Sequence, residues 1–96
     1  MPNGKQEIKV KLQDQLIGGV YTNALQITHT KEEFILDFLM ISPPTGVVNA
    51  RIITSPGHMK RIISAMGENV KKYEGKFGKI RQADEPETHG RVGFVS

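Results

Sequence analysis

The side chains that could do chemistry in this chain are few and far apart. Its three histidines, His29, His58 and His89, show neither H-x-x-x-H nor H-E-x-x-H spacing, so no pair of metal ligands lies on one helix face. The sequence has no G-x-S-x-G, Walker or G-x-G-x-x-G motif, which are the usual supports of nucleophilic and nucleotide-dependent catalysis. We therefore expect no metal, no cofactor and no catalytic residue, and a protein that is not an enzyme.

Asp37 is the acid with the most unusual expected surroundings. Its apolar neighbours would desolvate the carboxylate and raise its pKa, whereas Arg51, expected opposite it on the next strand, would lower that pKa. No second carboxylate is in view to share acid–base work. The pattern favours a cross-strand ion pair over a catalytic acid.

The segment that begins at Ser55 is a candidate anion site. Ser55 is a suitable helix N-cap, and Pro56 fits the first helical position, where its missing N–H costs nothing. Free N–H groups and the positive end of the helix dipole would lie beside basic side chains and could hold a phosphate or a carboxylate. Plain capping is the structural alternative. The candidate residues are Ser55, Gly57, His58, Lys60 and Arg61.

One long helix is predicted from this cap to Gly78. Apolar residues recur at steps of three and four and form a single stripe, which consists of Met59, Ile62, Ile63, Met66, Val70, Tyr73 and Phe77. The opposite side is a basic face with Lys60, Arg61, Ser64, Glu68, Lys71, Lys72 and Lys76. A basic face can follow a nucleic-acid backbone, or it can simply be the solvated side of the helix. Gly67, inside the helix, lowers helix stability by about 1 kcal/mol relative to Ala. Its presence at this cost could mark a close approach to another backbone.

Four strands are expected before the helix. Residues 7–12 alternate strictly between apolar and charged side chains, and residues 20–29 and 47–54 also favour strands. Residues 34–41 are ambiguous, because Thr30 and Glu33 form a capping-box pattern that allows a helix over 31–42. We prefer a strand, since a four-residue turn at 30–33 sets His29 opposite Phe34.

Pairing Ile41 with Val47 gives this sheet two unlike faces. Face A places Phe34, Leu36, Phe38 and Met40 beside Val48, Ala50, Ile52 and Thr54, with Leu25 and Ile27, and is the expected seat of the helix. Face B surrounds the Asp37–Arg51 pair with Ile35, Leu39, Ile41, Val47, Asn49 and Ile53. The expected core consists of Leu36, Phe38, Ile52, Ile62, Met66 and Val70. The predicted fold is α+β, an antiparallel meander of about four strands packed on one long C-terminal helix.

Composition limits the classes of protein that this chain can belong to. Its 96 residues, of which 38% are hydrophobic and 24% charged, suit one soluble domain. We expect a loose lead-in at 1–6, a domain at 7–80 and a flexible tail at 81–96, whose last six residues could add to a sheet edge. The absence of cysteine excludes disulfides, and no stretch is apolar enough for a membrane span, so we expect a cytoplasmic protein. A net charge of +3 does not by itself indicate nucleic acid.

Several spaced motifs between Gly18 and Ile80 resemble a family of short prokaryotic proteins that is known only as a domain of unknown function. They are N-x-x-x-I-T-H-T-x-E-E-F-x-L-D-F from Asn23, A-R-x-x-x-S-P-x-H-x-K-R from Ala50, and N-x-x-x-Y-E-x-x-F-G-x-I from Asn69. This resemblance implies neither an activity nor a catalytic residue. Four strands followed by a long helix are also similar to the fold order of the SecB export chaperone, whose subunits pair and present apolar grooves to unfolded chains.

Two functions from different classes follow as hypotheses. The first is a homodimeric protein-interaction module, either an adaptor or chaperone-like, whose candidate interface on face B consists of Ile35, Asp37, Leu39, Ile41, Arg51 and Ile53, with the helix as a rival surface. The second is a nucleic-acid-binding regulator that uses the basic face of the helix.

Overall fold

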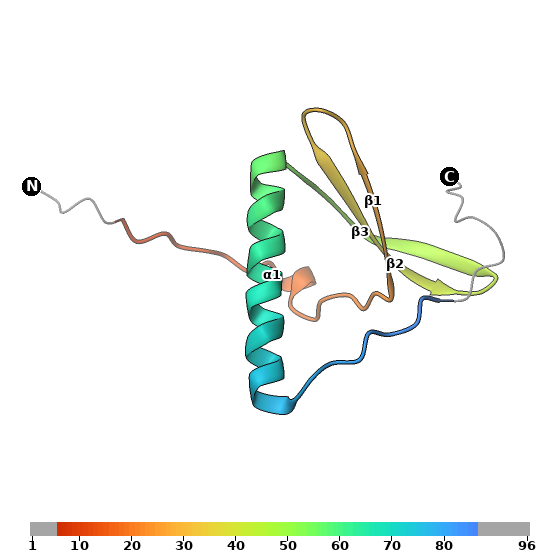
Figure 1. Cartoon of the computed structure of the whole chain (residues 1–96). Helices are drawn as coiled ribbons and strands as arrows, with labels where there is room; N and C mark the ends of the chain where they lie inside the picture. Colours follow the sequence, from red (N-terminus) through yellow and green to blue (C-terminus); the bar gives the residue numbers. More distant parts are fainter. Residues whose placement is uncertain (1–5, 87–96) are drawn as a thin grey trace, which may run out of the picture.

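The computed structural model describes residues 6–86, which form an antiparallel sheet followed by one long helix (Figure 1). This arrangement confirms the predicted α+β class. After a short 3-10 turn, η1 (Asp14–Leu16), the described strands are β1 (Ala24–His29), β2 (Phe34–Ser42) and β3 (Thr45–Thr54), in the spatial order β1-β2-β3. The helix α1 (Pro56–Phe77) begins two residues after β3 ends.

The first hairpin has the predicted register. His29 lies opposite Phe34, and the pairing continues through Ile27 with Leu36 to Leu25 with Phe38. The capping-box residues form a turn and not a helix start, because the Thr30 hydroxyl accepts the N–H groups of both Glu32 and Glu33 at 3.1 Å. The strand interpretation of residues 34–41 is therefore confirmed.

The second hairpin follows the predicted register only over its first half. Phe34 lies opposite Thr54, and the ladder agrees as far as Phe38 opposite Ala50. A bulge then shifts the pairing by one residue, so that Leu39 faces Val48 and the strands close through a two-residue turn at 43–44. The predicted pairs of Ile41 with Val47, Met40 with Val48 and Leu39 with Asn49 are wrong. Because opposite residues share a face, Val47 lies with Met40 on face A.

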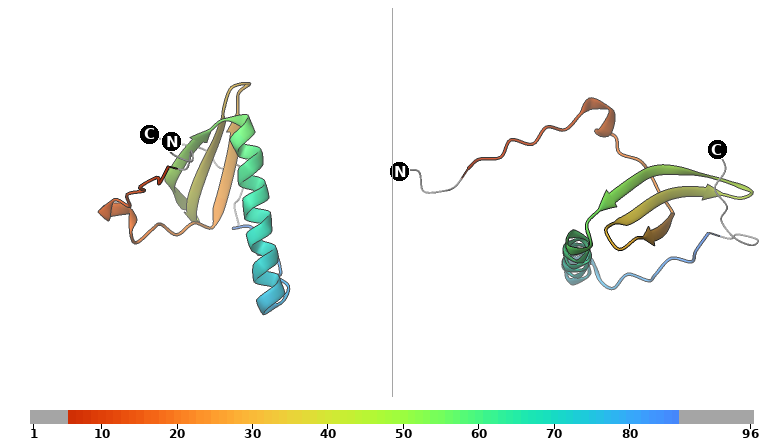
Figure 2. Two further views of the ribbon diagram at one scale, coloured as in Figure 1. Left: turned by 90° about the vertical axis from the view of Figure 1, so that its left-hand side faces the viewer. Right: turned by 90° about the horizontal axis from the view of Figure 1, so that it is seen from above.

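Residues 7–12 are not a strand in the structure. This segment, which we call the arm, leads away from the sheet (Figures 1 and 2), and Ile8, Val10 and Leu12 are 80%, 88% and 61% exposed. The sheet of the described residues therefore has three strands where about four were expected. The alternating pattern is typical of a strand, but the arm pairs with no strand among residues 6–86.

Two asparagines fix the chain where it enters β1. The side-chain amide of Asn23 exchanges two hydrogen bonds with the backbone of Ile41, at 2.8 and 2.9 Å, as a further strand residue would. Asn49, at the bulge, donates from Nδ2 to the Tyr21 carbonyl at 2.7 Å. Since β2 lies between β1 and β3, the chain before β1 crosses the end of β2 and reaches β3. The arm then departs on the β3 side of the sheet, whereas α1 lies on the β1 side (Figure 2).

The helix α1 has the predicted ends. The Ser55 hydroxyl accepts the His58 N–H, and Gly78, with φ of 101°, donates its N–H to the Glu74 carbonyl. Figures 1 and 2 show that the C-terminal half of α1 extends past the sheet. Met59, in the first turn, is the one buried helix residue, and the rest of the stripe is half-buried or exposed.

The core is smaller than the sequence predicts. Among the described residues the buried hydrophobic side chains are Leu36, Leu39 and Met59. Of the six expected core residues, Leu36 is buried, Phe38 and Ile62 are half-buried, and Ile52, Met66 and Val70 are exposed. The prediction assumed that the helix lies along the sheet, whereas it touches the sheet near its own start.

Within residues 6–86, no helix combines the length and the apolarity that crossing a bilayer requires. The expected lead-in at 1–6 and flexible tail at 81–96 lie largely outside the described residues, as does the added strand expected from the last six residues.

Candidate functional site

Asp37 and Arg51 form the ion pair that the sequence predicts. They are register partners on β2 and β3, and the guanidinium binds the carboxylate with two parallel hydrogen bonds, Nε to Oδ1 at 2.6 Å and a terminal nitrogen to Oδ2 at 2.9 Å. Asp37 is 3% exposed, while the side chain of Arg51 is 56% exposed. The arginine therefore covers the carboxylate with its planar fork and keeps much of its own surface in water.

The charges of this pair stabilise each other. Hydrogen bonds from Arg51 lower the pKa of Asp37, burial acts in the opposite direction, and the positive charge of Arg51 lowers that pKa further. The same hydrogen bonds and the negative charge of Asp37 raise the pKa of Arg51. The carboxylate is thus held ionised, which suits a structural ion pair and not a general acid.

Gln26 extends this polar row onto the third strand. It lies opposite Asp37 on β1, so Gln26, Asp37 and Arg51 follow one another across the sheet. Its Oε1 atom is buried and receives no hydrogen bond from any described residue. A buried acceptor without a donor is costly, commonly about 1–3 kcal/mol. The sequence pattern gave no sign of this atom, because its burial depends on the neighbouring strands.

The other predicted interface residues differ in exposure. Leu39 is buried, Ile35 and Ile41 are half-buried, and Ile53 is exposed. The chain that crosses the end of β2 lies close to Leu39, because the Asn23 N–H is bonded to the Leu39 carbonyl. Face B is therefore a mixed surface, with its exposed apolar part on β3.

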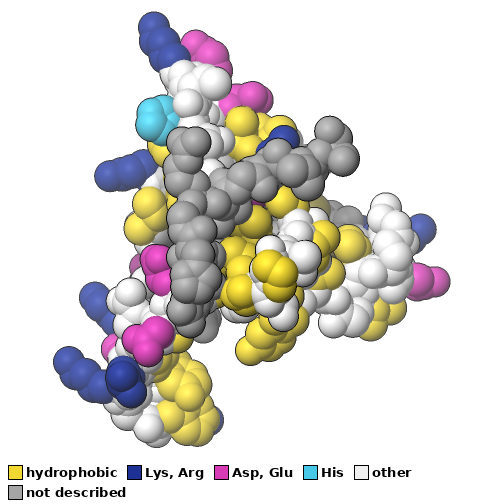
Figure 3. All heavy atoms as spheres, turned by 90° about the vertical axis from the view of Figure 1, so that its right-hand side faces the viewer, with side chains coloured by type: hydrophobic (Ala, Val, Ile, Leu, Met, Phe, Trp, Pro, Cys, Tyr) yellow, Lys and Arg dark blue, Asp and Glu magenta, His cyan; other side chains and the backbone are white. Residues whose placement is uncertain are grey.

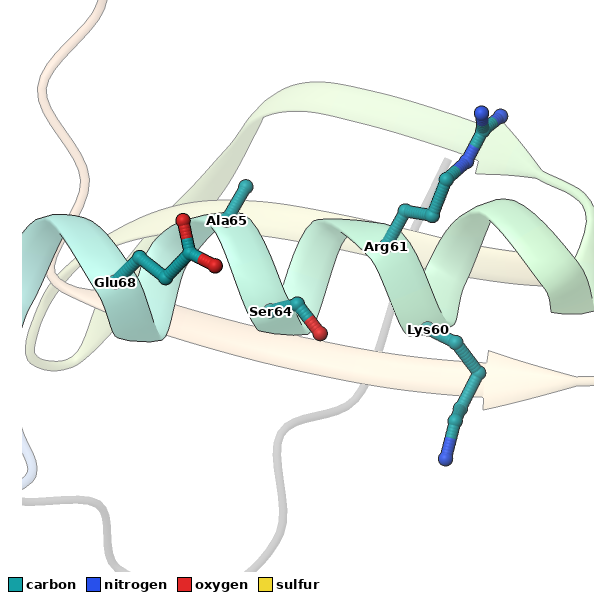
Figure 4. A pocket seen from close by; sticks show the side chains of 5 residues that line it. All are labelled: Lys60, Arg61, Ser64, Ala65 and Glu68. Atoms are coloured by element: carbon teal, nitrogen blue, oxygen red, sulfur yellow. The ribbon is translucent and has the colours of Figure 1, made fainter.

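The predicted anion site lies at the start of α1. The N–H groups of His58 and Met59 are bonded to Ser55, and Pro56 has none. Beyond them, Lys60 and Arg61 line a shallow depression with Ser64, Ala65 and Glu68. Figure 4 shows Lys60 and Arg61 pointing to opposite sides of the helix. The first turn is thus arranged for capping, and the two cations do not converge on one point. Anion binding stays a prediction.

The histidines are separated in the structure as in the sequence. His29 lies against the Phe34 ring, with the ring centres 5.5 Å apart, and His58 is exposed at the start of α1. His89 lies outside the described residues. Within residues 6–86, no three His, Cys, Asp or Glu side chains come together as a metal site.

Apolar side chains stay at the surface over much of the molecule. In Figure 3, the sheet face that is turned away from α1 carries hydrophobic side chains, and others gather at the far end of the helix. Exposed large hydrophobic residues of α1 include Ile63, Met66, Val70, Tyr73 and Phe77. A monomer that exposes this much contiguous apolar surface usually has a partner.

Comparison with known proteins places the chain in a family. No curated protein and no solved structure matches it. A family profile matches residues 1–82, which includes the arm and begins before the motifs that start near Gly18. The expected membership of a domain-of-unknown-function family is confirmed. The chain belongs to the family described as Protein of unknown function (DUF3467).

Proposed function

We propose that this protein is a non-enzymatic homodimer that serves as a protein-interaction module, either an adaptor or chaperone-like. The observation that carries the proposal is the uncovered apolar stripe of α1, on which Met66 is 56% exposed and Tyr73 is 49% exposed. Burying apolar surface is worth roughly 25 cal/mol per Å². A second subunit that covers the stripe would gain this free energy, less the cost of association.

The stripe is the favoured contact, and face B is its rival. On face B the buried Asp37 is already paired and Leu39 is already covered, so less of that face is left for a partner. The far half of α1 extends past the sheet (Figures 1 and 2), and its apolar residues Val70, Tyr73 and Phe77 are exposed.

A matched pair of charge substitutions tests the stripe. Met66→Asp places a carboxylate on the stripe, and Ser64→Asp places one on the opposite side of the same helix. Both positions are exposed, so neither change disturbs the core. We expect a wild-type dimer in light scattering, a dimer for Ser64→Asp, and at least about tenfold weaker association for Met66→Asp, which corresponds to about 1.4 kcal/mol.

Other outcomes would reject the dimer or place its interface on another surface. A wild-type monomer at high micromolar concentration rejects the dimer. A dimer that resists Met66→Asp but is weakened by Asp37→Ala, and not by Lys71→Ala, moves the interface to face B, where Arg51 would lose its partner. Binding of a permanently unfolded protein, such as reduced and carboxymethylated α-lactalbumin, separates a chaperone-like role from an adaptor role.

The likeness to the SecB chaperone rested on four expected strands before the helix, whereas the described residues contain three, so it adds no support to this proposal. The nucleic-acid alternative is supported by the exposed basic side chains of α1, which lie opposite the stripe and include Lys60, Arg61, Lys71, Lys72 and Lys76. Titrating salt against generic duplex DNA decides between the two functions. Affinity that falls steeply with salt supports the regulator, and no binding at low salt rejects it.

A further inference from the structure

We propose that the arm, residues 7–12, pairs as an added antiparallel strand with the free edge of β1 in a second copy of this chain. The inference rests on the proposed homodimer and names the segment through which two copies exchange contacts. Such strand addition gives affinity through backbone hydrogen bonds and specificity through alternating side chains.

The arm is built as a strand without a partner. Its charged residues, Glu7, Lys9 and Lys11, alternate with three apolar residues that are 61% to 88% exposed. The family profile spans this segment, so the arm belongs to the family's domain. A six-residue run that alternates so regularly can bury one side when it lies beside a sheet.

The outer edge of β1 fits the arm in length and in apolar pattern. β1 has six residues, as the arm has, and the two antiparallel registers that set apolar residues beside apolar residues pair five of them. Leu25 and Ile27 on one side of β1 are 49% and 44% exposed, since no described strand flanks them on that edge. Pairing that sets Ile8, Val10 and Leu12 on the same side as Leu25 and Ile27 covers them.

The polar side of β1 provides an independent reason to place the arm beside β1. The same pairing places the arm's lysines on the side of Gln26, whose buried Oε1 lacks a donor among the described residues. Lys9 or Lys11, according to the register, would lie one strand spacing of about 4.8 Å from Gln26. Either lysine can donate to the oxygen once the Gln26 side chain turns toward the arm, because the oxygen has almost no accessible surface within the chain. The arm thus supplies both an apolar side for Leu25 and Ile27 and a donor for Gln26.

The course of the chain favours a second copy over the arm's own sheet. The Tyr21 carbonyl is bonded to Asn49 on β3, so the chain before β1 reaches the opposite edge of the sheet from the free edge of β1. The arm leaves on that β3 side and leads away (Figure 2). Its own β1 edge lies across the sheet. In a second copy the same edge has no neighbouring strand among the described residues, and the arm would approach it beside α1, which lies on that side (Figure 2).

Cysteine cross-linking tests the pairing directly, because the chain has no cysteine of its own. Chains with Val10→Cys are mixed with chains that carry Leu25→Cys or Ile27→Cys, the two positions that can face Val10 in this arrangement. Opposite strand residues have Cβ atoms about 4.5–5.5 Å apart, which oxidation can bridge with little movement. We expect a disulfide between different chains, identified by mass spectrometry, for one of the two mixtures.

A matched control uses Val47→Cys, an exposed position on the opposite edge strand. Cross-linking to β1 should exceed cross-linking to Val47→Cys at least about tenfold, a difference of about 1.4 kcal/mol. Preference for Val47→Cys, or no cross-link at either edge, overturns the proposal. A single chain that carries Val10→Cys and Ile27→Cys and closes on itself at high dilution also overturns it, because the arm would then lie on its own sheet.

Light scattering on the wild type distinguishes a failure of the arm-pairing proposal from a failure of the homodimer proposal. A dimer that does not cross-link rejects the arm and leaves the helix stripe or face B as the contact. A monomer that does not cross-link rejects both proposals.

Discussion

At the scale of single residues, the Asp37–Arg51 pair predicts how stability changes with pH. Because hydrogen bonds from Arg51 lower the pKa of Asp37 in the folded chain, the ionised carboxylate stabilises the fold above about pH 3.9, the ordinary pKa of an aspartate. This contribution is lost as the pH falls through the lower folded pKa. We therefore expect Asp37→Asn to lower the melting temperature at pH 7 and to have a much smaller effect at acid pH.

Melting curves of the wild type and Asp37→Asn between pH 7 and pH 2 measure this difference. Asp14→Asn, which removes the carboxylate of an exposed aspartate, is the matched control and should lower the melting temperature at pH 7 much less than Asp37→Asn does. A gap between wild type and Asp37→Asn that stays constant down to pH 2 would mean that the carboxylate gains nothing from ionisation.

Leu36 provides the second prediction at this scale. It is 3% exposed at the centre of β2, whereas its register partner Ile52 is 46% exposed. Leu36→Ala should cost about 2–5 kcal/mol of unfolding free energy in denaturant titrations. Ile52→Ala removes a similar volume from an open site and should cost clearly less. Equal losses at the two positions would show that Ile52 is covered as well, for which a partner subunit is the simplest cause.

At the scale of elements, Gly67 distinguishes a free helix from a packed one. A Cβ atom built on Gly67 has open space around it within the chain. Gly67→Ala should therefore stabilise α1 by about 1 kcal/mol where the helix is free. If two helices approach closely at this glycine, the same change weakens the dimer instead.

Thermal melts and light scattering on Gly67→Ala measure both effects. Gly75→Ala is the matched control, since that glycine also lies in α1 with open space around it. A gain in stability with unchanged dimerisation at both positions places the helix contact away from Gly67.

The sequence predicted those elements that depend on local patterns. The cap at Ser55, the end at Gly78 and the turn after His29 are each fixed by residues within a few positions of one another. The bulge at Asn49 was missed because the amide of Asn49 is bonded to Tyr21, 28 positions earlier in the chain. A long-range bond of this kind leaves no periodic signal.

The candidate site, like the secondary-structure elements, was predictable only where it depends on local patterns. The Asp37–Arg51 pair was predicted from a pairing of Ile41 with Val47 that is wrong. The two residues are nevertheless opposite each other, because the bulge at Asn49 offsets the shift at the turn. The unpaired Gln26 oxygen and the exposure of the stripe could not be foreseen, since both depend on which surfaces meet. The pattern of residues 7–12 predicted a strand that the structure does not contain, because alternation alone does not identify a partner strand.

At the scale of the whole molecule, the chain is more extended than a compact domain of its length. Its Cα radius of gyration is 17.5 Å, whereas a compact domain of this length has about 13 Å. The arm and the far half of α1 both extend from the sheet with apolar side chains exposed. A second subunit would cover these surfaces, so folding and association should be coupled.

Coupling of this kind makes the melting temperature depend on protein concentration. If the folded state is a dimer and the unfolded state a monomer, a hundredfold increase in concentration adds about 2.7 kcal/mol to the stability of the dimer. For a dimer of two chains of this length, the melting temperature should then rise by roughly 5–10 °C. Melting curves at concentrations a hundredfold apart measure the shift, and Met66→Asp should lower the melting temperature at both concentrations because association is weaker. A melting temperature that is independent of concentration, together with a compact scattering profile, would mean that a single chain folds around its own stripe.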